Sequence, residues 1–298
     1  MNTSNDTVTQ PLHIFSSSIQ RKPMLEMFAS STSSYSVTGN TDLLAVLASN
    51  AEDYSLLKYP MSWPSPGDPY YTNEGAQRRY YYGVNTVPRL IMNGIEQNNP
   101  IGFTQQEFDN AYQLYSFIDL DANYSVGGQK VDVEVNINSL CNTANIWDNL
   151  TLYAAIFEYT TYNNVSTNGE IEFYNIMKKM LPDHNGTPLP DLYGPNNPTF
   201  TMDLDYEFMG SYNIPADAST PIDHLLEHSV EDFQNLGVVV WIQDEDTKYI
   251  VQSATANMIS STNNLDTEIQ ILVFPNPTID KINIVLKGVL RDNVDIKL

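Results

Sequence analysis

The sequence contains a single cysteine, Cys141, among 298 residues. One cysteine excludes an intrachain disulfide and a cysteine-based zinc cluster. Basic residues are also scarce, since 14 Lys and Arg stand against 36 Asp and Glu, a formal net charge of −22. This charge repels nucleic-acid phosphates and anionic lipid, so we expect neither nucleic acid nor a membrane surface as a partner.

Long hydrophobic runs are missing as well. No apolar segment approaches the roughly 18 residues that a membrane-spanning helix needs, so we expect no membrane span. Residues 1–6 are polar, and no apolar signal segment is present at the start. The surface is rich in Asn, Ser and Thr, and only 17% of the residues are charged. Two interpretations stay open at this point: a cytosolic protein, or an exported one in its mature or trimmed form.

In the first half of the chain strands and helices alternate. Strands are predicted for residues 23–28, 54–59 and 87–92, the last ending in an Asn93-Gly94 turn. Helices are predicted for residues 37–49 and 73–82, and Thr104-Gln105-Gln106-Glu107 is a capping box that opens a third. This alternation predicts an α/β domain.

From about residue 123 the pattern has period two. Val131, Val133, Val135 and Ile137 alternate with polar residues, and residues 150–158, 237–243 and 249–256 are further strands. We expect an all-β sandwich with one long connection that contains residues 173–180. The predicted organisation is a polar tail (1–12), the α/β domain (13–120), the sandwich (121–259), a linker (260–268) and a partial β domain (269–298) with strands at 269–274, 281–286 and 294–298.

Three stretches carry a family resemblance: "PMLEMFASSTSSYS", "YPMSWPSPGDPYY" and "RRYYYGVNTVPRLIMNG". Together with later segments, over about residues 20–258, they resemble the thioredoxin-like outer membrane family of Bacteroidota, named for a 28-kilodalton member. The resemblance implies a thioredoxin-like domain followed by a β-sandwich. It also implies that Thr86, Val87 and Pro88 form the loop whose cis proline faces the redox loop.

The segment "VFPNPTIDKINI" is similar to the start of the C-terminal sorting domain of type IX secretion substrates. Such domains are about twice as long as the segment present here, so it looks truncated. The similarity implies an extracellular or outer-membrane location and the type IX secretion machinery as a partner.

The sequence departs from the family at its redox centre. Ser33, Ser34, Tyr35 and Ser36 occupy the Cys-x-x-Cys positions, and Thr32 replaces a tryptophan. A serine hydroxyl is far less acidic than a thiol with a pKa of about 8.5, and it forms no disulfide. Thiol–disulfide oxidoreductase chemistry is therefore excluded unless Ser33 and Ser36 replace native cysteines. A hydrolytic serine needs a positioned base, and the capping role of these serines is favoured.

In the family, the groove between the redox loop and the cis-proline loop binds extended peptide through main-chain bonds. Serines keep that shape without the covalent step, so we expect non-catalytic binding or assembly, with an extended peptide or a surface protein as the ligand. Trp63, Tyr70 and Tyr81 are the aromatic residues expected to line the groove. The alternative is a structural subunit of a surface polymer or coat that acts through self-association.

Two patterns suggest metal ions. His224-Leu225-Leu226-Glu227-His228 fits the H-x-x-E-H spacing of inverted zinc peptidases, but an exposed acidic helix is favoured over a zinc hydrolase. The acidic sets Asp203/Asp205/Glu207 and Asp244/Glu245/Asp246 lack the spacing of a calcium loop and read as solvated surface, although weak calcium binding at the second stays open. We expect no catalytic residue and no cofactor.

Overall fold

The computed structural model describes residues 17–194, 199–215, 217–259, 270–274 and 283–287. The chain forms two compact units, Met1–Ile259 and Ser260–Leu298. In the second unit, β18 (Gln270–Phe274) and β19 (Asn283–Lys287) pair antiparallel. The predicted tail at 1–12, the linker at 260–268 and the strand at 294–298 lie outside the described residues.

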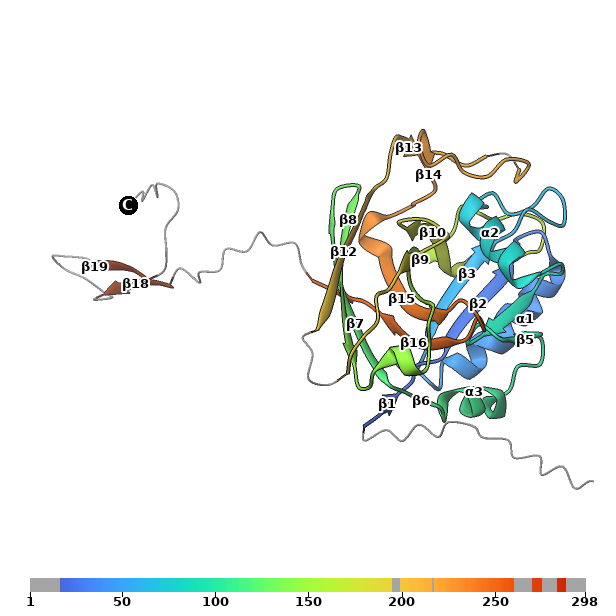
Figure 1. The fold of residues 1–298 in the computed structure, drawn as a ribbon. Helices are drawn as coiled ribbons and strands as arrows, with labels where there is room; N and C mark the ends of the chain where they lie inside the picture. Colours follow the sequence, from blue (N-terminus) through green and yellow to red (C-terminus); the bar gives the residue numbers. More distant parts are fainter. Residues whose placement is uncertain (1–16, 195–198, 216, 260–269, 275–282, 288–298) are drawn as a thin grey trace, which may run out of the picture. The chain divides into compact units, whose positions relative to one another are not determined.

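The first unit is built around a sheet of nine strands (Figure 1). In spatial order the strands are β16 (Ile250–Thr255), β15 (Leu236–Asp244), β9 (Leu150–Thr161), β10 (Phe173–Leu181), β3 (Ser55–Pro60), β2 (Met24–Ala29), β4 (Arg89–Met92) and β5 (Glu96–Asn98), with β11 (Thr187–Pro188) also on β9. The pairs β2–β3 and β3–β10 are parallel. Strands from both sides of residue 120 therefore share one sheet, and a mixed α/β region continues into β-rich structure.

The pairing of residues on neighbouring strands shows which side chains lie on the same face of this sheet. Met27 is opposite Lys58, Lys58 is opposite Ile176, and Glu158 is opposite both Ile176 and Leu236. Because residues directly opposite one another lie on the same face, these five side chains share a face.

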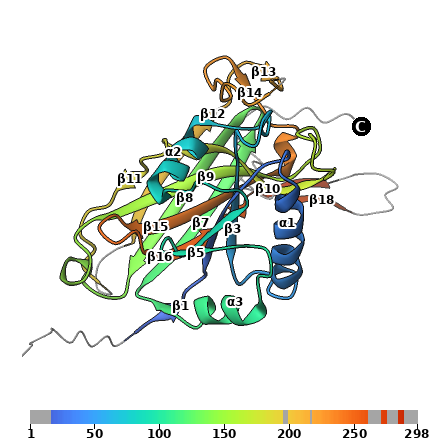
Figure 2. The same cartoon turned by 90° about the vertical axis from the view of Figure 1, so that its right-hand side faces the viewer.

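Different layers cover the two ends of that face. Over β2, residues of α1 (Ser34–Leu47) and α3 (Gln105–Tyr112) form a buried cluster with Leu25 and Met27. Figure 2 shows the two helices beside the sheet. Over β15, an antiparallel pair of long strands packs on Leu236 and Val238. These strands are β7 (Ile118–Gly127) and β8 (Lys130–Ser139), which form a four-stranded sheet with β12 (Phe200–Glu207) and β17 (Asn257–Met258). Lys58 and Ile176 lie between the helical cover and the β cover.

The opposite face of the nine-stranded sheet packs against α2 (Asn73–Tyr82). Its Tyr82 belongs to a buried cluster with Tyr59 and Met24 of the first half of the chain and Phe157 and Trp241 of the second. The hydrophobic core therefore combines residues from both predicted domains.

Short elements complete the unit. They are β1 (Ile19–Gln20) paired with β6 (Tyr115–Ser116), β13 (Ser211–Tyr212) paired with β14 (Glu227–His228), and the 3₁₀ turns Thr143–Asn145 and Phe233–Asn235. Within the described residues, no helix combines the length and the apolar character that crossing a membrane requires.

Local capping explains why two helices begin where the sequence predicts. The Thr72 hydroxyl accepts a hydrogen bond from the Gly75 amide at 3.1 Å, at the start of α2. At α3 the capping box is complete, because Thr104 accepts from the Glu107 amide and the Glu107 carboxylate accepts from the Thr104 amide at 2.8 Å. Each bond satisfies an amide that the helix leaves without a partner.

Two predicted elements are wrong. Residues 173–180, predicted to lie in a connection, belong to β10 in the centre of the sheet. Lys178 made this segment look like a surface connection in the sequence. Its charge is in fact buried and paired, since Lys178 Nζ lies 3.1 Å from a Glu158 carboxylate oxygen. Residues 224–228 form a turn and then β14 rather than a helix, because the Asp223 carboxylate accepts from the Leu225 amide at 3.0 Å and Glu227 pairs with Ser211.

Candidate functional site

The serine loop joins the end of β2 to the start of α1. Ser33 is the N-cap residue of α1, with φ at −100°, and its side chain caps no amide of the helix. Its hydroxyl instead donates to the Val87 carbonyl at 3.5 Å, while the Ser36 hydroxyl accepts from the Ser30 amide at 3.3 Å. Both serines are buried. Within the described residues their hydroxyls serve local structure, and neither contacts a histidine.

The proline loop lies directly against α1. The Val87–Pro88 bond is cis, as the family resemblance implies. A Cβ added at Gly39 of α1 would lie 3.0 Å from Pro88 Cγ and 2.9 Å from Pro100 Cγ. Glycine at this position therefore allows α1 to pack closely against both prolines.

A third loop meets the other two at Thr32. The Thr32 hydroxyl donates to the Pro64 carbonyl at 2.6 Å, which ties the serine loop to the segment that carries Trp63. Trp63 is partly buried, and the Arg79 guanidinium lies 4.3 Å from its ring centroid. Trp63 and Val87 pack against the same core cluster. We call the residues 30–36, 62–64 and 86–88 together the loop surface.

The other two predicted groove aromatics have different environments. Tyr70 is completely buried, and its hydroxyl donates to Glu231 at 2.7 Å, so its ring cannot line an open groove. Tyr81 donates to Glu245 at 3.0 Å, and the Arg78 guanidinium and the Lys248 ammonium lie 4.8 and 4.6 Å from the centroid of its ring. Of the three predicted aromatics, Trp63 is the one that belongs to the loop surface.

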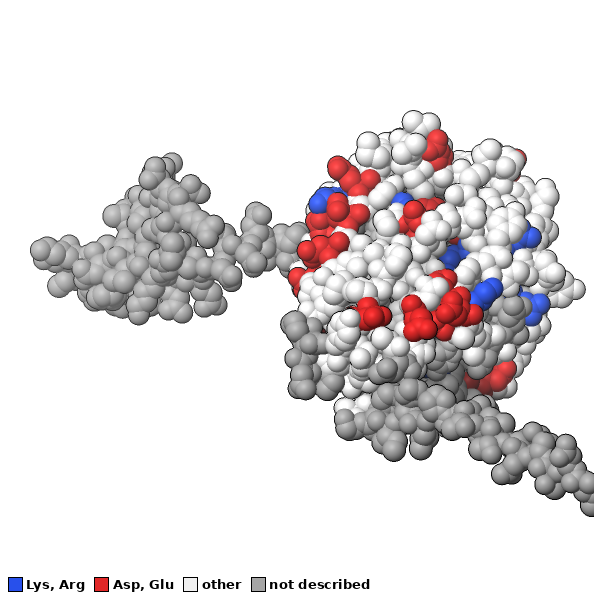
Figure 3. All heavy atoms as spheres, in the orientation of Figure 1, with Lys and Arg blue, Asp and Glu red and all other residues white. Residues whose placement is uncertain are grey.

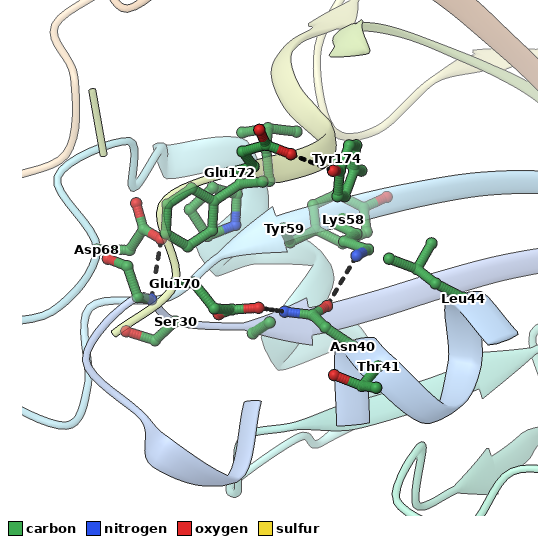
Figure 4. A pocket seen from close by; sticks show the side chains of 15 residues that line it. Ser30, Asn40, Thr41, Leu44, Lys58, Tyr59, Asp68, Glu170, Glu172 and Tyr174 are labelled. Carbon is green, nitrogen blue, oxygen red and sulfur yellow. Dashed lines mark hydrogen bonds between the residues drawn. The ribbon is translucent and has the colours of Figure 1, made fainter. Parts of the chain in front are cut away.

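A series of hydrogen-bonded polar side chains, which sequence reasoning missed, holds the backbone of the serine loop. The Asn168 side-chain amide lies 3.4 Å from the carbonyls of Ser30 and Ser33 and donates to Glu170 at 2.6 Å. Glu170 accepts from Asn40 at 2.7 Å, and Asn40 accepts from Lys58 at 2.7 Å (Figure 4). The one signal in the sequence is Lys58, a lone charge inside an otherwise apolar predicted strand.

Asp68 anchors the same loop from another side. Its carboxylate accepts from the Ser31 amide at 3.1 Å and from the Tyr70 amide at 3.0 Å. Burial raises the pKa of Asp68 to about 6, although these hydrogen bonds work in the opposite direction. A buried carboxyl therefore fixes the backbone next to the serines.

The two histidines of the H-x-x-E-H pattern occupy separate environments. His224 Nε2 lies 3.4 Å from Glu74, which also pairs with Lys179 at 2.7 Å. His228 is buried among the rings of Phe208 and Phe233, and burial together with the nearby Lys178 lowers its pKa. Within the described part of the chain no three His, Cys, Asp or Glu side chains gather in a way that could hold a metal ion.

The first acidic set lies on the surface, as its alternation with apolar residues predicts. The prediction of solvated surface is wrong for the second set, because Asp244 is buried and Glu245 is half-buried. Asp203, Asp205 and Glu207 are exposed on β12, whose intervening residues pack inward. Figure 3 shows acidic side chains gathered on the surface over β8 and β12. Asp203 is directly opposite Glu134, and Asp205 is directly opposite Asp132. The second set occupies the β15–β16 turn, where Asp244 accepts from Thr247 at 2.5 Å and Glu245 accepts from Tyr153 at 2.8 Å.

The sequence matches no protein-family model and no curated protein. A solved structure does share its fold. HBP35 of Porphyromonas gingivalis matches with a TM-score of 0.59 and 10% identity, over 90% of this chain and 85% of that one. At this identity the likeness shows the fold alone.

Two further structures match less well. Protein AGR_C_4864 from Agrobacterium tumefaciens gives a TM-score of 0.47 at 16% identity, over 80% of this chain and 95% of that one. A domain of the outer membrane lipoprotein Omp28 from Porphyromonas gingivalis gives 0.31 at 12% identity, over 49% and 92%. Neither TM-score reaches 0.5, so neither likeness supports an inference about this chain.

Proposed function

We propose that this chain is a redox-inactive, thioredoxin-like protein of the cell surface or extracellular space that binds an extended peptide segment without catalysis. The observation that carries the proposal is the contact between Ser33 and Val87. The serine loop and the proline loop meet as a thiol site would require, yet both reactive positions hold hydroxyls. Because a serine hydroxyl stays un-ionised near neutral pH and forms no disulfide, the proposal keeps recognition of the peptide and omits the covalent step.

The loop surface offers groups suited to an extended chain. Tyr35 is 69% exposed at the start of α1, and Thr86 is exposed beside Val87. Tyr and Trp provide large contact area with few rotatable bonds, so Tyr35 and Trp63 are the side chains expected to contribute most to affinity. The cell-surface location rests on the family resemblance and on the segment similar to a sorting domain.

Self-association into a polymer is less well supported. In the described residues β12 is an edge of its sheet, eight residues long, with acidic side chains along its exposed face. Pairing this edge with a second copy would bring like charges together, and charged edges oppose such pairing. We therefore favour binding of a different chain.

The test is selection of linear peptides from a random library on the immobilised protein. We expect the selected peptides to bind Tyr35→Ala and Trp63→Ala at least about tenfold more weakly, since hot-spot aromatics contribute 1.4 kcal/mol or more. Tyr115→Ala is the matched control, because Tyr115 is 62% exposed on β6, outside the loop surface. Equal binding by all three variants would refute the proposed location.

A further inference from the structure

A cavity of about 140 Å³ lies behind the serine loop, between α1, β3 and the chain that enters β10 (Figure 4). It occupies the gap between the helical cover and the β cover of the central sheet. Apolar groups of Leu44, Pro60, Phe173 and Ile176 line it, and exposed Thr41 and Glu172 stand at its edge. An engineered apolar cavity of about 150 Å³ holds benzene, so this volume suits a compact ligand of about six to eight heavy atoms.

Lys58 is the one cationic side chain among the residues that line this cavity. It is only 3% exposed, and its amine donates to Asn40 at 2.7 Å. An ammonium group has three N–H donors, so two have no acceptor among the described residues. Lys178 shows the contrast: also buried, it contacts Glu158 at 3.1 Å, the Ser229 carbonyl at 2.6 Å and the Tyr70 ring at 3.7 Å.

The amine of Lys58 is partly unprotonated near neutral pH. Burial lowers its pKa to about 8, and the nearby Glu170 opposes part of that shift. At pH 7 about a tenth of the amine is therefore neutral and nucleophilic, against less than about a thousandth for an ordinary lysine. The other titratable groups lining the cavity are Tyr59, Asp68, Glu170, Glu172 and Tyr174.

The charges around the cavity restrict the ligand. Asp68, Glu170 and Glu172 disfavour an anion, and the cost of dehydrating a charged ligand in a small, largely apolar cavity disfavours a cation.

We propose that the cavity binds small aldehydes with a short apolar body and that Lys58 captures them reversibly as a Schiff base. The amine lone pair attacks the carbonyl carbon, and the carbonyl oxygen takes up a proton to give a carbinolamine. Loss of the oxygen as water, with both hydrogens supplied by the amine, leaves the C=N bond, and nothing is oxidised or reduced.

The test is incubation of the full chain with isobutyraldehyde and cyanoborohydride, followed by peptide mapping by mass spectrometry. We expect the Lys58 peptide to be modified at least about tenfold faster than that of Lys130, whose side chain is 43% exposed. Its rate should rise with pH to a midpoint near 8. Lys178 should stay unmodified. Modification of Lys58 no faster than that of Lys130 would overturn the proposal.

Two variants separate capture in the cavity from general lysine reactivity. Thr41→Trp narrows the entrance and leaves Lys58 in place, so modification of Lys58 should fall at least tenfold. Thr38→Trp, at another exposed position of α1 that does not line the cavity, should leave it unchanged. Equal modification in both variants would refute entry at Thr41. Peptide binding at the loop surface, measured on Thr41→Trp, which leaves Lys58 and its hydrogen bond to Asn40 in place, should be unaffected, so the two proposals can fail independently.

Discussion

At the scale of single residues, Asp68 links stability to pH. Its folded pKa of about 6 lies above the ordinary value of 3.8, so the folded state holds this proton more tightly than the unfolded state. The free energy of unfolding contributed by Asp68 therefore falls as pH rises from about 4 to about 6. The difference between the folded pKa of about 6 and the ordinary pKa of 3.8 corresponds to a total change in the free energy of unfolding of about 3 kcal/mol.

We expect the unfolding free energy of the wild type minus that of Asp68→Asn to decrease by about 2–2.5 kcal/mol between pH 4 and pH 7. Urea unfolding at several pH values measures this difference and removes the contribution of other carboxyls. Asp121→Asn, at an exposed position of β7, is the control and should give a nearly constant difference. A difference that grows with pH would show that Asp68 is stabilised in its ionised form.

Ser33 and Ser36 give a second prediction at this scale. The Ser36 amide donates to the Ser33 carbonyl at 3.0 Å, a turn that brings the two residues close together. If their Cα atoms lie within about 7 Å, a disulfide can form without backbone movement. We expect the double variant Ser33→Cys, Ser36→Cys to lose two mass units on mild oxidation and to keep one titratable thiol, Cys141. Three free thiols in the folded, oxidised variant would mean that the loop has diverged in shape.

At the scale of elements, the neighbouring strands β8 and β12 place acidic residues directly opposite one another. Asp203 is opposite Glu134, and cross-strand carboxylates repel each other. Asp203→Lys should therefore raise the free energy of unfolding by about 0.2–1 kcal/mol, and more at low salt. Thr201→Lys, opposite the neutral Asn136, is the control and should change stability less. Thermal unfolding at two salt concentrations checks this, and a salt-independent result would contradict it.

The elements that sequence reasoning identified are those fixed by near neighbours. The caps at Thr72 and Thr104 act over three residues, so the starts of α2 and α3 could be read directly. β10 could not be predicted in this way, because two consecutive lysines, Lys178 and Lys179, are typical of a segment on the surface. Their charges are buried only because Glu158 and Glu74 come from distant strands and helices.

The candidate site divides in the same way. The serine loop, Pro88 and Trp63 were found because each belongs to a short recognisable stretch. The chain from Lys58 through Asn40 to Glu170 was missed, because Asn40 and Glu170 are 130 residues apart and meet only in the folded sheet. A resemblance between short stretches of sequence does not predict contacts between residues that are far apart in the chain.

At the scale of the whole molecule, the shared sheet decides where the chain can be cut. The domain boundary expected at residue 120 separates β3 from its parallel partner β10. It also divides the buried cluster in which Tyr59 packs with Trp241 and Phe157. A fragment of residues 13–120 would expose an interior strand edge, which is open to pairing with other chains, and this apolar face, whose contact with water is unfavourable.

We therefore expect the fragment 13–120 to lack a cooperative thermal transition, whereas residues 13–259 should melt as one unit. Removal of residues 260–298 should leave the melting temperature nearly unchanged, because Ser260–Leu298 forms a separate unit. Circular dichroism and calorimetry of the three lengths provide the measurement, with co-expression of 13–120 and 121–259 as the test for complementation. If the fragment 13–120 melts cooperatively alone, the first half of the chain is an independent domain and the contacts of β3 with β10 are an interface between domains. If it gains a transition only with its complement, the nine-stranded sheet is the folding unit.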